Sequence, residues 1–230
     1  MTDKVLALSF DDGPDDATPA ILDLLAKYDA HATFFVLGRQ VLGREHILVR
    51  MRDEGHELGN HTFDHLRIPD ASPEEIEDEL VRTSREIERA TAVTPRLMRP
   101  PFGLGGERAA PVARKLGLEV AVWTRNSEDW RGEPAATIAE RLLRAEPGEV
   151  VVLHDGLAEG GSRIETVRAL EVAVPAWVER GLRIVSVGEL FRMRPWSGRR
   201  HVIVETSRVR TAVRLTTSSV RAALSGRGAD

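Results

Sequence analysis

The stretch LALSFDDGPDD, residues 6–16, sets two adjacent carboxylates directly behind an apolar run. Residues 6–10 have the composition of a buried strand, and Asp11 and Asp12 end it ahead of a Gly-Pro pair that is typical of a turn. Neighbouring carboxylates repel each other and resist burial, so this strand end needs a compensating partner. A cation held against Asp12 would remove the cost of its charge.

Strand-like and helix-like segments alternate from this stretch onward. The apolar patterning predicts seven strands, at residues 4–10, 32–37, 56–60, 96–98, 118–123, 149–153 and 182–185. A helix is expected between each strand and the next: the first has Thr18 as its N-cap, and the others cover residues 45–54, 73–89, 107–116, 135–145 and 164–179. Ser72 and Glu75 form a capping-box pattern ahead of the helix at 73–89.

This alternation indicates a parallel sheet, because parallel strands are joined by crossover helices. We expect an α/β fold, specifically a deformed (β/α) barrel of seven β/α units that forms a catalytic domain over residues 1–196. A doubly wound open sheet is the alternative. Residues 197–230 are rich in Ser, Thr and Arg and are expected to be a C-terminal appendage.

Composition narrows the classes of function. The 230 residues carry a formal net charge of −4 and no cysteine, so a basic nucleic-acid-binding surface and thiolate chemistry are not expected. A metal site would have to use His, Asp or Glu. No segment is apolar for long enough to span a membrane, and the first residues lack a signal peptide. We therefore expect a cytoplasmic protein if Met1 is the native start.

Polar clusters follow five of the predicted strands. They occupy residues 11–14, 61–65, 99–102, 126–130 and 154–156. The carboxyl ends of parallel strands are where active sites assemble in α/β folds. We therefore expect these five clusters to meet in one site.

His61 and His65 are four residues apart and suit one face of a metal site. With Asp12 they supply two imidazoles and one carboxylate, a ligand set for a divalent cation with positions left for water and substrate. Asp11 then lies close enough to reach a water molecule at the cation, which is the position of a general base. The alternative for Asp11 is a local turn or helix cap.

The same clusters resemble the five motifs of the polysaccharide deacetylases, the NodB-homology domain of carbohydrate esterase family 4. The matching segments, in the order of the family, are Ser9-Phe10-Asp11-Asp12-Gly13-Pro14, His61-Thr62-x-x-His65, Arg99-x-Pro101-Phe102, Asp129-Trp130 and Leu153-His154. The resemblance spans roughly residues 3–193.

The resemblance implies a deformed (β/α) barrel, one divalent metal ion, usually zinc, and hydrolytic removal of N-acetyl groups from N-acetylglucosamine-type sugars. It also implies a role for each matching residue. The metal ligands are Asp12, His61 and His65, the base is Asp11, its orienting partner is Arg99, the general acid is His154, and the residue that tunes the acid is Asp129.

Two positions depart from the family pattern. Phe102 stands where Tyr is more usual, although the backbone N–H implied to bind the oxyanion is retained. Asn126 stands where Asp is frequent, which affects the sugar-binding edge more than the chemistry. Trp130 and Leu153 either line a small pocket for the acetyl methyl group or belong to the ordinary apolar core.

Three functions remain open from the sequence. The first is a metal-dependent N-deacetylase of a polysaccharide, oligosaccharide or sugar conjugate. The second is a deacylase of a small non-polymeric amide in secondary metabolism. The third is a catalytically inactive carbohydrate-binding module, although Asp11, His154 and all three metal ligands are present. The lack of a leader favours a soluble or lipid-linked sugar over mature cell wall as the substrate.

Overall fold

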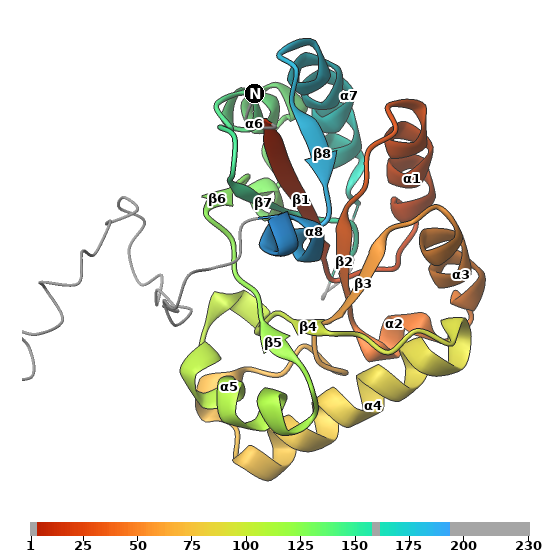
Figure 1. Ribbon diagram of the computed structural model, residues 1–230, viewed down its shortest axis with the longest axis vertical. Helices are drawn as coiled ribbons and strands as arrows, with labels where there is room; N and C mark the ends of the chain where they lie inside the picture. Colours follow the sequence, from red (N-terminus) through yellow and green to blue (C-terminus); the bar gives the residue numbers. More distant parts are fainter. Residues whose placement is uncertain (1–3, 158–161, 194–230) are drawn as a thin grey trace, which may run out of the picture.

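A curled parallel sheet wrapped by helices forms the protein (Figure 1). The computed structural model describes residues 4–157 and 162–193, so the appendage expected at 197–230 lies outside the described residues. The strands are β1 Val5–Asp11, β2 Thr33–Val36, β3 Glu57–Asn60, β4 Leu97–Met98, β5 Glu119–Val120, β6 Arg125–Asn126, β7 Val150–His154 and β8 Arg183–Val185. The helices are α1 Thr18–Lys27, α2 Gly38–Val41, α3 Glu45–Asp53, α4 Pro73–Thr91, α5 Gly106–Lys115, α6 Ala135–Leu143, α7 Ile164–Glu179 and α8 Val187–Met193.

The strand order β5-β4-β3-β2-β1-β7-β6 confirms the deformed (β/α) barrel. β1 is central: β7 pairs along one edge, and β8 and then β2 pair along the other. The two outermost strands, β5 and β6, are separated by only residues 121–124 of the chain. The sheet therefore curls until its ends are connected by a short link, unlike a doubly wound open sheet.

The single strand expected at residues 118–123 is wrong in its extent. Only β5 is regular there, and the chain then crosses to form β6, which the sequence did not predict. The link is fixed at both ends, because the Ala121 N–H donates to Met98 O at 2.8 Å and the Thr124 N–H donates to Val150 O at 2.9 Å. One short segment thus pairs with two different neighbours and cannot remain one straight strand.

The start of α1 also differs from the expectation. Ala17 occupies the N-cap position, without a side-chain cap, and Thr18 is the first helical residue. The Thr18 hydroxyl donates instead to Asp155 Oδ2 at 2.6 Å and accepts from the Asp15 N–H at 2.8 Å. In contrast, the capping box of α4 is confirmed, with reciprocal hydrogen bonds between Ser72 and Glu75.

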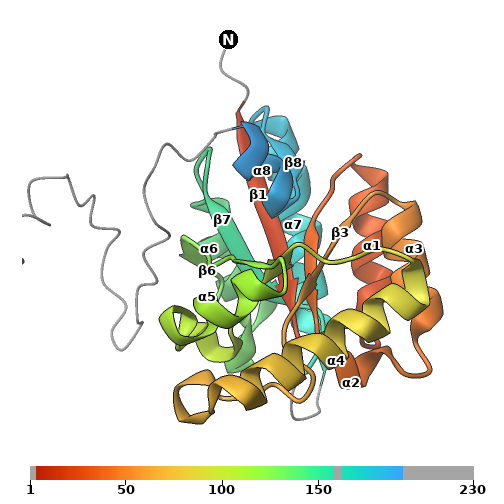
Figure 2. The same ribbon diagram turned by 60° about the horizontal axis from the view of Figure 1, so that its bottom comes forward.

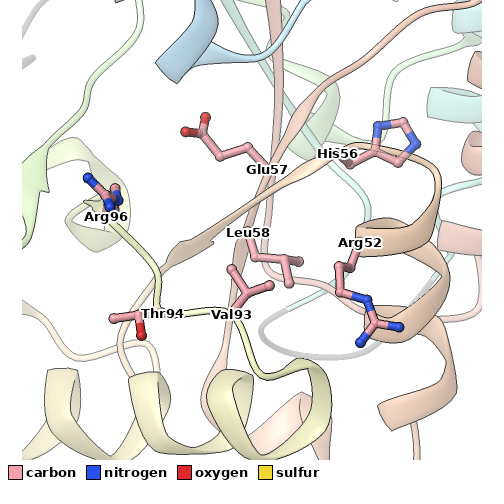
Figure 3. Close-up of a pocket in the computed structure, with 7 residues that line it drawn as sticks. All are labelled: Arg52, His56, Glu57, Leu58, Val93, Thr94 and Arg96. Carbon is pink, nitrogen blue, oxygen red and sulfur yellow. The ribbon is translucent and has the colours of Figure 1, made fainter.

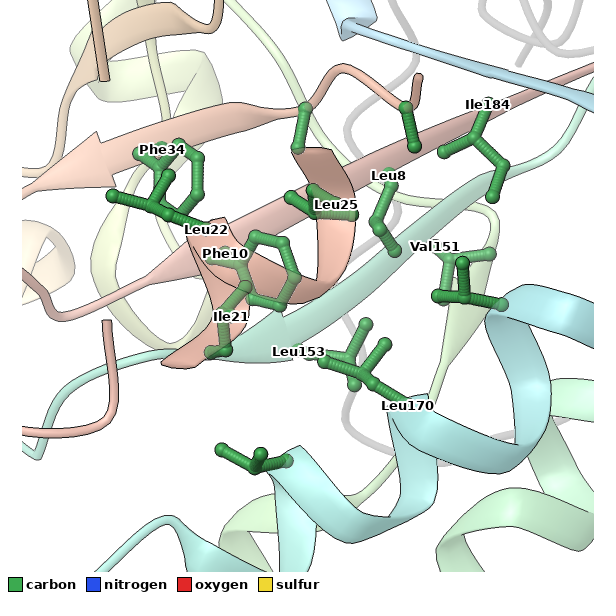
Figure 4. Close-up of a cluster of buried hydrophobic side chains, with 14 of the residues drawn as sticks. Leu8, Phe10, Ile21, Leu22, Leu25, Phe34, Val151, Leu153, Leu170 and Ile184 are labelled. Atoms are coloured by element: carbon green, nitrogen blue, oxygen red, sulfur yellow. The ribbon is translucent and has the colours of Figure 1, made fainter. Parts of the chain in front are cut away.

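Side-chain alternation along the central strands separates an outer from an inner face. Leu8, Phe10, Val151 and Leu153 point outward into the main apolar cluster, against α1 and α7 (Figure 4). The intervening residues of β1 and β7 point into the barrel, where the apolar positions at their amino ends are small, such as Ala7. The same alternation brings Asp11 and His154, the last residues of the two strands, to the inner face.

Helix α4 packs along α2, α3 and α5 beside the carboxyl end of β3 (Figure 2). It is the longest described helix and buries one face built around Ile76, Leu80 and Ile87. Within residues 4–157 and 162–193, none of the helices is both long and apolar enough to cross a membrane.

Candidate active site

The end of β1 places the carboxylates of Asp11 and Asp12 near the same histidine, His61. Asp11 is the last residue of β1, and Asp12 has a φ of 74°, in the left-handed region, so the regular alternation stops between them. His61 Nε2 lies 3.9 Å from Asp11 Oδ2 and 3.5 Å from Asp12 Oδ1. Both acids are buried.

The structure brings the three predicted metal ligands together. One ligand atom from each of Asp12, His61 and His65 lies within 4.8 Å of the others. Asp12 Oδ1 is 3.3 Å from His65 Nε2 and is a buried oxygen without a hydrogen-bond partner among the described residues. A buried carboxylate oxygen in that state is suited to a cation.

The histidines present the correct nitrogen. His61 Nδ1 lies 2.8 Å from the backbone carbonyl oxygen of Arg99, so Nδ1 carries the proton and Nε2 has its lone pair free. Burial and the neighbouring His61 lower the pKa of His65 to about 4, which keeps its imidazole neutral at physiological pH.

The spacing of the ligand atoms suits zinc. Two ligands of a tetrahedral zinc ion stand roughly 3.3–3.4 Å apart. The separations of 3.3 and 3.5 Å from Asp12 Oδ1 to the two histidines fit this value.

Arg99 fixes the carboxylate of Asp11. Its guanidinium is fully buried, and Nη1 donates to Asp11 Oδ1 at 2.7 Å and to the Ser9 hydroxyl at 2.9 Å. Nε donates to Ala121 O at 3.2 Å, and the guanidinium lies over the Phe35 ring at 4.0 Å. Burial lowers the pKa of Arg99, and the opposite charge of Asp11 counteracts this effect. Asp11 is therefore held in one orientation by a buried ion pair.

His154 and Asp129 form the other half of the site. Asp129 Oδ1 lies 2.7 Å from His154 Nδ1, and Asp129 Oδ2 accepts from the His154 backbone N–H at 2.9 Å. Burial lowers the pKa of His154, but the Asp129 carboxylate, with the charges of Asp11 and Asp12, outweighs burial and raises this pKa to about 9. Because β1 and β7 pair with Asp11 next to His154, this imidazole stands beside the Asp11 carboxylate.

Asp129 remains ionised although it is buried. Burial disfavours its charge, but the His154 imidazolium and its hydrogen bonds, together with the charge of Arg163, hold the pKa of this carboxyl below its usual value. The Thr166 hydroxyl donates to Oδ2 at 3.0 Å and the Ser127 hydroxyl donates to Oδ1 at 3.0 Å. Arg163 at the start of α7 donates to the Asp129 backbone carbonyl at 3.3 Å. With Nδ1 so occupied, Nε2 of His154 is the atom that can act on a substrate.

The three predicted substrate-binding residues have different surroundings. The Phe102 ring is half exposed and lies 4.5 Å from the His65 ring, and Trp130 is half exposed next to Asp129. Leu153, however, is fully buried in the outer apolar cluster with Leu170 and is not brought to the site (Figure 4). Alternation turns Leu153 away from the face that His154 occupies, and places Val152 on it instead.

Asp155 is a buried acid that the sequence reasoning did not assign. Burial raises its pKa to about 7, and its Oδ2 accepts from Thr18. A Cβ at Gly13 would lie 2.0 Å from Asp155 Oδ2, so any larger residue after Asp12 would displace the Asp155 carboxyl group. The Asp155 carboxyl group thus packs against the turn that carries Asp12, a predicted metal ligand.

A pocket of about 160 Å³ lies elsewhere, at the amino ends of β3 and β4 (Figure 3). Its lining residues are Arg52, His56, Glu57, Leu58, Val93, Thr94 and Arg96. Because His61 and Arg99 follow the opposite ends of these strands, this pocket takes no part in the site.

The sequence is similar to those of known polysaccharide deacetylases. A family model described as polysaccharide deacetylase matches residues 1–121. A peptidoglycan-N-acetylglucosamine deacetylase from Bacillus cereus is 36% identical over 194 residues, covering 83% of this chain and 89% of the relative. A chitooligosaccharide deacetylase from a Bradyrhizobium species is 37% identical over 194 residues, covering 80% of this chain and 89% of the relative.

Solved structures share the fold. Peptidoglycan deacetylase PdaC from Bacillus subtilis aligns with a TM-score of 0.77 at 33% identity, covering 84% of this chain and 93% of that chain. A CE4 family pseudoenzyme from Bacillus anthracis aligns with a TM-score of 0.74 at 28% identity, covering 82% of this chain and 66% of that chain. The fold is therefore shared by enzymes and by a pseudoenzyme, and activity depends on the residues of the site.

Proposed function

The chain belongs to the polysaccharide deacetylase family, and from this premise we propose that it is a divalent-metal-dependent hydrolase of N-acetylglucosamine-type sugars. It would remove the N-acetyl group, giving acetate and a free amine. One observation carries the proposal: the His61–His65–Asp12 cluster, the Arg99-paired Asp11 and the Asp129-paired His154 meet at the carboxyl ends of adjacent strands.

Asp12, His61 and His65 would hold the metal ion, and zinc suits their two nitrogens and one oxygen. When bound, a divalent cation supplies a Lewis acid that polarises an amide carbonyl and makes water more acidic. Asp11 is the base that accepts a proton from the attacking water, in the orientation that Arg99 imposes.

His154 performs the opposite proton transfer. It begins protonated, because Asp129 raises its pKa to about 9, and it donates from Nε2 to the departing nitrogen. The ionised Asp129 accepts a hydrogen bond from the Nδ1–H of His154 and stabilises the imidazolium. The carbonyl carbon gains the water oxygen, the C–N bond breaks, and one proton enters through His154 as another leaves to Asp11. The backbone N–H of Phe102 would bind the oxyanion.

The test is release of acetate by zinc-loaded protein from chitooligosaccharides, peptidoglycan fragments and monosaccharide conjugates. We expect turnover on at least one substrate that contains N-acetylglucosamine, and none after chelation. Zinc binding without turnover on any of them would refute the enzyme and indicate a pseudoenzyme. Turnover confined to small non-sugar amides would refute the sugar substrate.

A further inference from the structure

The loop that carries both metal histidines has an unusual backbone. Thr62 has a φ of 68° and His65 a φ of 62°, and neither residue is glycine. Side chains with a Cβ rarely adopt this left-handed conformation, so the surrounding structure must hold the loop in place. In the metal-free protein, neighbouring residues must hold Thr62 and His65 in this conformation.

Backbone contacts secure one side of the loop. The carbonyls of Thr62 and Phe63 accept from the N–H groups of Gly38 and Arg39, at 3.1 and 3.2 Å. Asn60 Oδ1 accepts from the Thr62 N–H at 2.9 Å. These contacts come from α2 and from the end of β3, and they leave the N–H groups of Phe63 and Asp64 to be satisfied.

Glu79 of α4 satisfies both. Its Oε2 accepts from the Phe63 N–H at 2.7 Å and from the Asp64 N–H at 2.8 Å. Its Oε1 lies 3.6 Å from Arg82 Nη1, one turn further along the helix. Glu79 is 7% exposed, so this is a buried carboxylate on a helix face whose other buried positions include Ile76 and Leu80.

A carboxylate at this position is costly unless the loop requires it. Burying a charge is unfavourable, and an apolar side chain would satisfy the packing of this helix face. One anionic oxygen that accepts from two successive N–H groups makes strong, directional hydrogen bonds. These donors lie between His61 and His65, so the orientation of Glu79 determines the geometry of the residues between the two ligands.

We propose that Glu79 is a positioning residue that pre-organises the His61–His65 loop for metal binding. The inference rests on the proposed metal site. It assigns Glu79 no contact with substrate or metal. Its effect is on the loop, which Glu79 holds in the ligating conformation in the metal-free protein, so that binding does not have to order it.

The experiment compares zinc affinity and folding in the full chain. Glu79→Gln retains the size of the side chain and removes its charge, and Glu77→Gln makes the same change at an exposed position of α4 as a matched control. Zinc dissociation constants are measured by competition with a chromophoric chelator, and melting temperatures are measured on the metal-free proteins. We expect Glu79→Gln to weaken zinc binding roughly tenfold at a nearly unchanged melting temperature, and Glu77→Gln to leave both unchanged.

Equal zinc affinity in the two variants, with wild-type protein binding zinc, would overturn the assignment of Glu79. If wild-type protein binds no zinc, the proposed function fails instead. Hydrogen exchange of the Phe63 and Asp64 amides in metal-free wild-type protein tests independently whether the loop is ordered before metal binds. This measurement remains possible if Glu79→Gln does not fold. We expect slow exchange at both amides, and exchange as fast as in an open loop would refute the pre-organisation.

Discussion

Asp11 and His154 lie side by side at the ends of β1 and β7, and each has a buried partner that sets its charge and orientation. Arg99 holds Asp11 through a 2.7 Å contact, and Asp129 holds His154 through another of the same length. The proposed roles of Asp11 as base and His154 as acid rest on these partners, since the carboxylate is paired with a cation and the imidazole with an anion. This difference makes the two roles separately testable.

Asp11→Asn tests the base. The amide retains the shape of the carboxylate but cannot accept a proton, so we expect turnover to fall by about 10²–10⁴-fold or more. The zinc content should remain that of wild-type protein, because Asp12, His61 and His65 are unchanged. Initial rates of acetate release and elemental analysis of the same sample measure both quantities. Turnover near the wild-type rate would remove Asp11 from the mechanism.

Asp129→Asn tests the tuning of the acid. His154 has a pKa of about 9 instead of 6.5 because the Asp129 carboxylate outweighs burial. Without that charge, only Asp11 and Asp12 oppose burial, so the pKa of His154 falls and we expect the alkaline limb of the pH–rate profile to move to lower pH. A profile of kcat/KM against pH on zinc-loaded protein measures this shift. An alkaline limb at the wild-type position would show that Asp129 does not set the protonation of His154.

The same pair predicts how stability depends on pH. The folded-state pKa of His154 is raised, so its contribution to stability is complete below pH 6.5 and is lost as the pH rises through about 9. Urea titrations of metal-free protein between these values should show this loss in wild-type protein and a much smaller one in Asp129→Asn. A loss of equal size in both proteins would assign it to another group.

Residues in short motifs were predictable, and their supporting residues were not. A parallel fold concentrates its chemistry at the carboxyl ends of its strands. The motif residues at or shortly after these ends are Asp11, Asp12, His61, His65 and His154. The Asp129 donor Thr166, in contrast, comes from a helix whose position only the folded chain determines. Leu153 was placed by proximity to His154, whereas strand alternation favours Val152, and that signal was present in the sequence.

At the scale of elements, the long helices and central strands were predictable and the sheet edges were not. The helix at 164–179 has the bounds expected from its amphipathic pattern, and β1 differs by one residue at each end. β4, β5 and β6 have two residues each, too few to show a period. Their hydrogen bonds depend on closure of the barrel, which is a property of the whole sheet.

The capping box of α4 gives a prediction at this scale. Ser72 accepts from the Glu75 N–H and Glu75 accepts from the Ser72 N–H, so Ser72→Ala leaves a helix-end donor without its partner. We expect the free energy of unfolding to fall by about 1 kcal/mol, measured by urea titration. The zinc affinity should not change, because Glu79 lies beyond the first turn of the helix. A large loss of affinity would mean that the end of α4 controls the metal loop directly.

At the scale of the whole molecule, the site joins parts of the chain that are distant in sequence. The predicted metal ligands follow β1 and β3, Arg99 follows β4, and His154 ends β7. Alternation of strands and helices predicted that these ends would meet. It did not predict how β1 shares one edge between β8 and β2, because that depends on the curl of the sheet.

Metal binding should therefore stabilise the entire fold. A ligand that binds only the folded state at 100 times its dissociation constant adds about 2.7 kcal/mol of stability. For a domain of this size, that corresponds to a rise in melting temperature of roughly 5–10 °C. We expect zinc to produce this rise, chelation to reverse it and abolish turnover, and added zinc to restore both.

His65→Ala is the control and should lose most of the zinc-dependent rise in melting temperature, because it removes one of three proposed ligands while leaving the barrel intact. Full turnover by protein shown to be metal-free by elemental analysis would refute the metal-dependent mechanism.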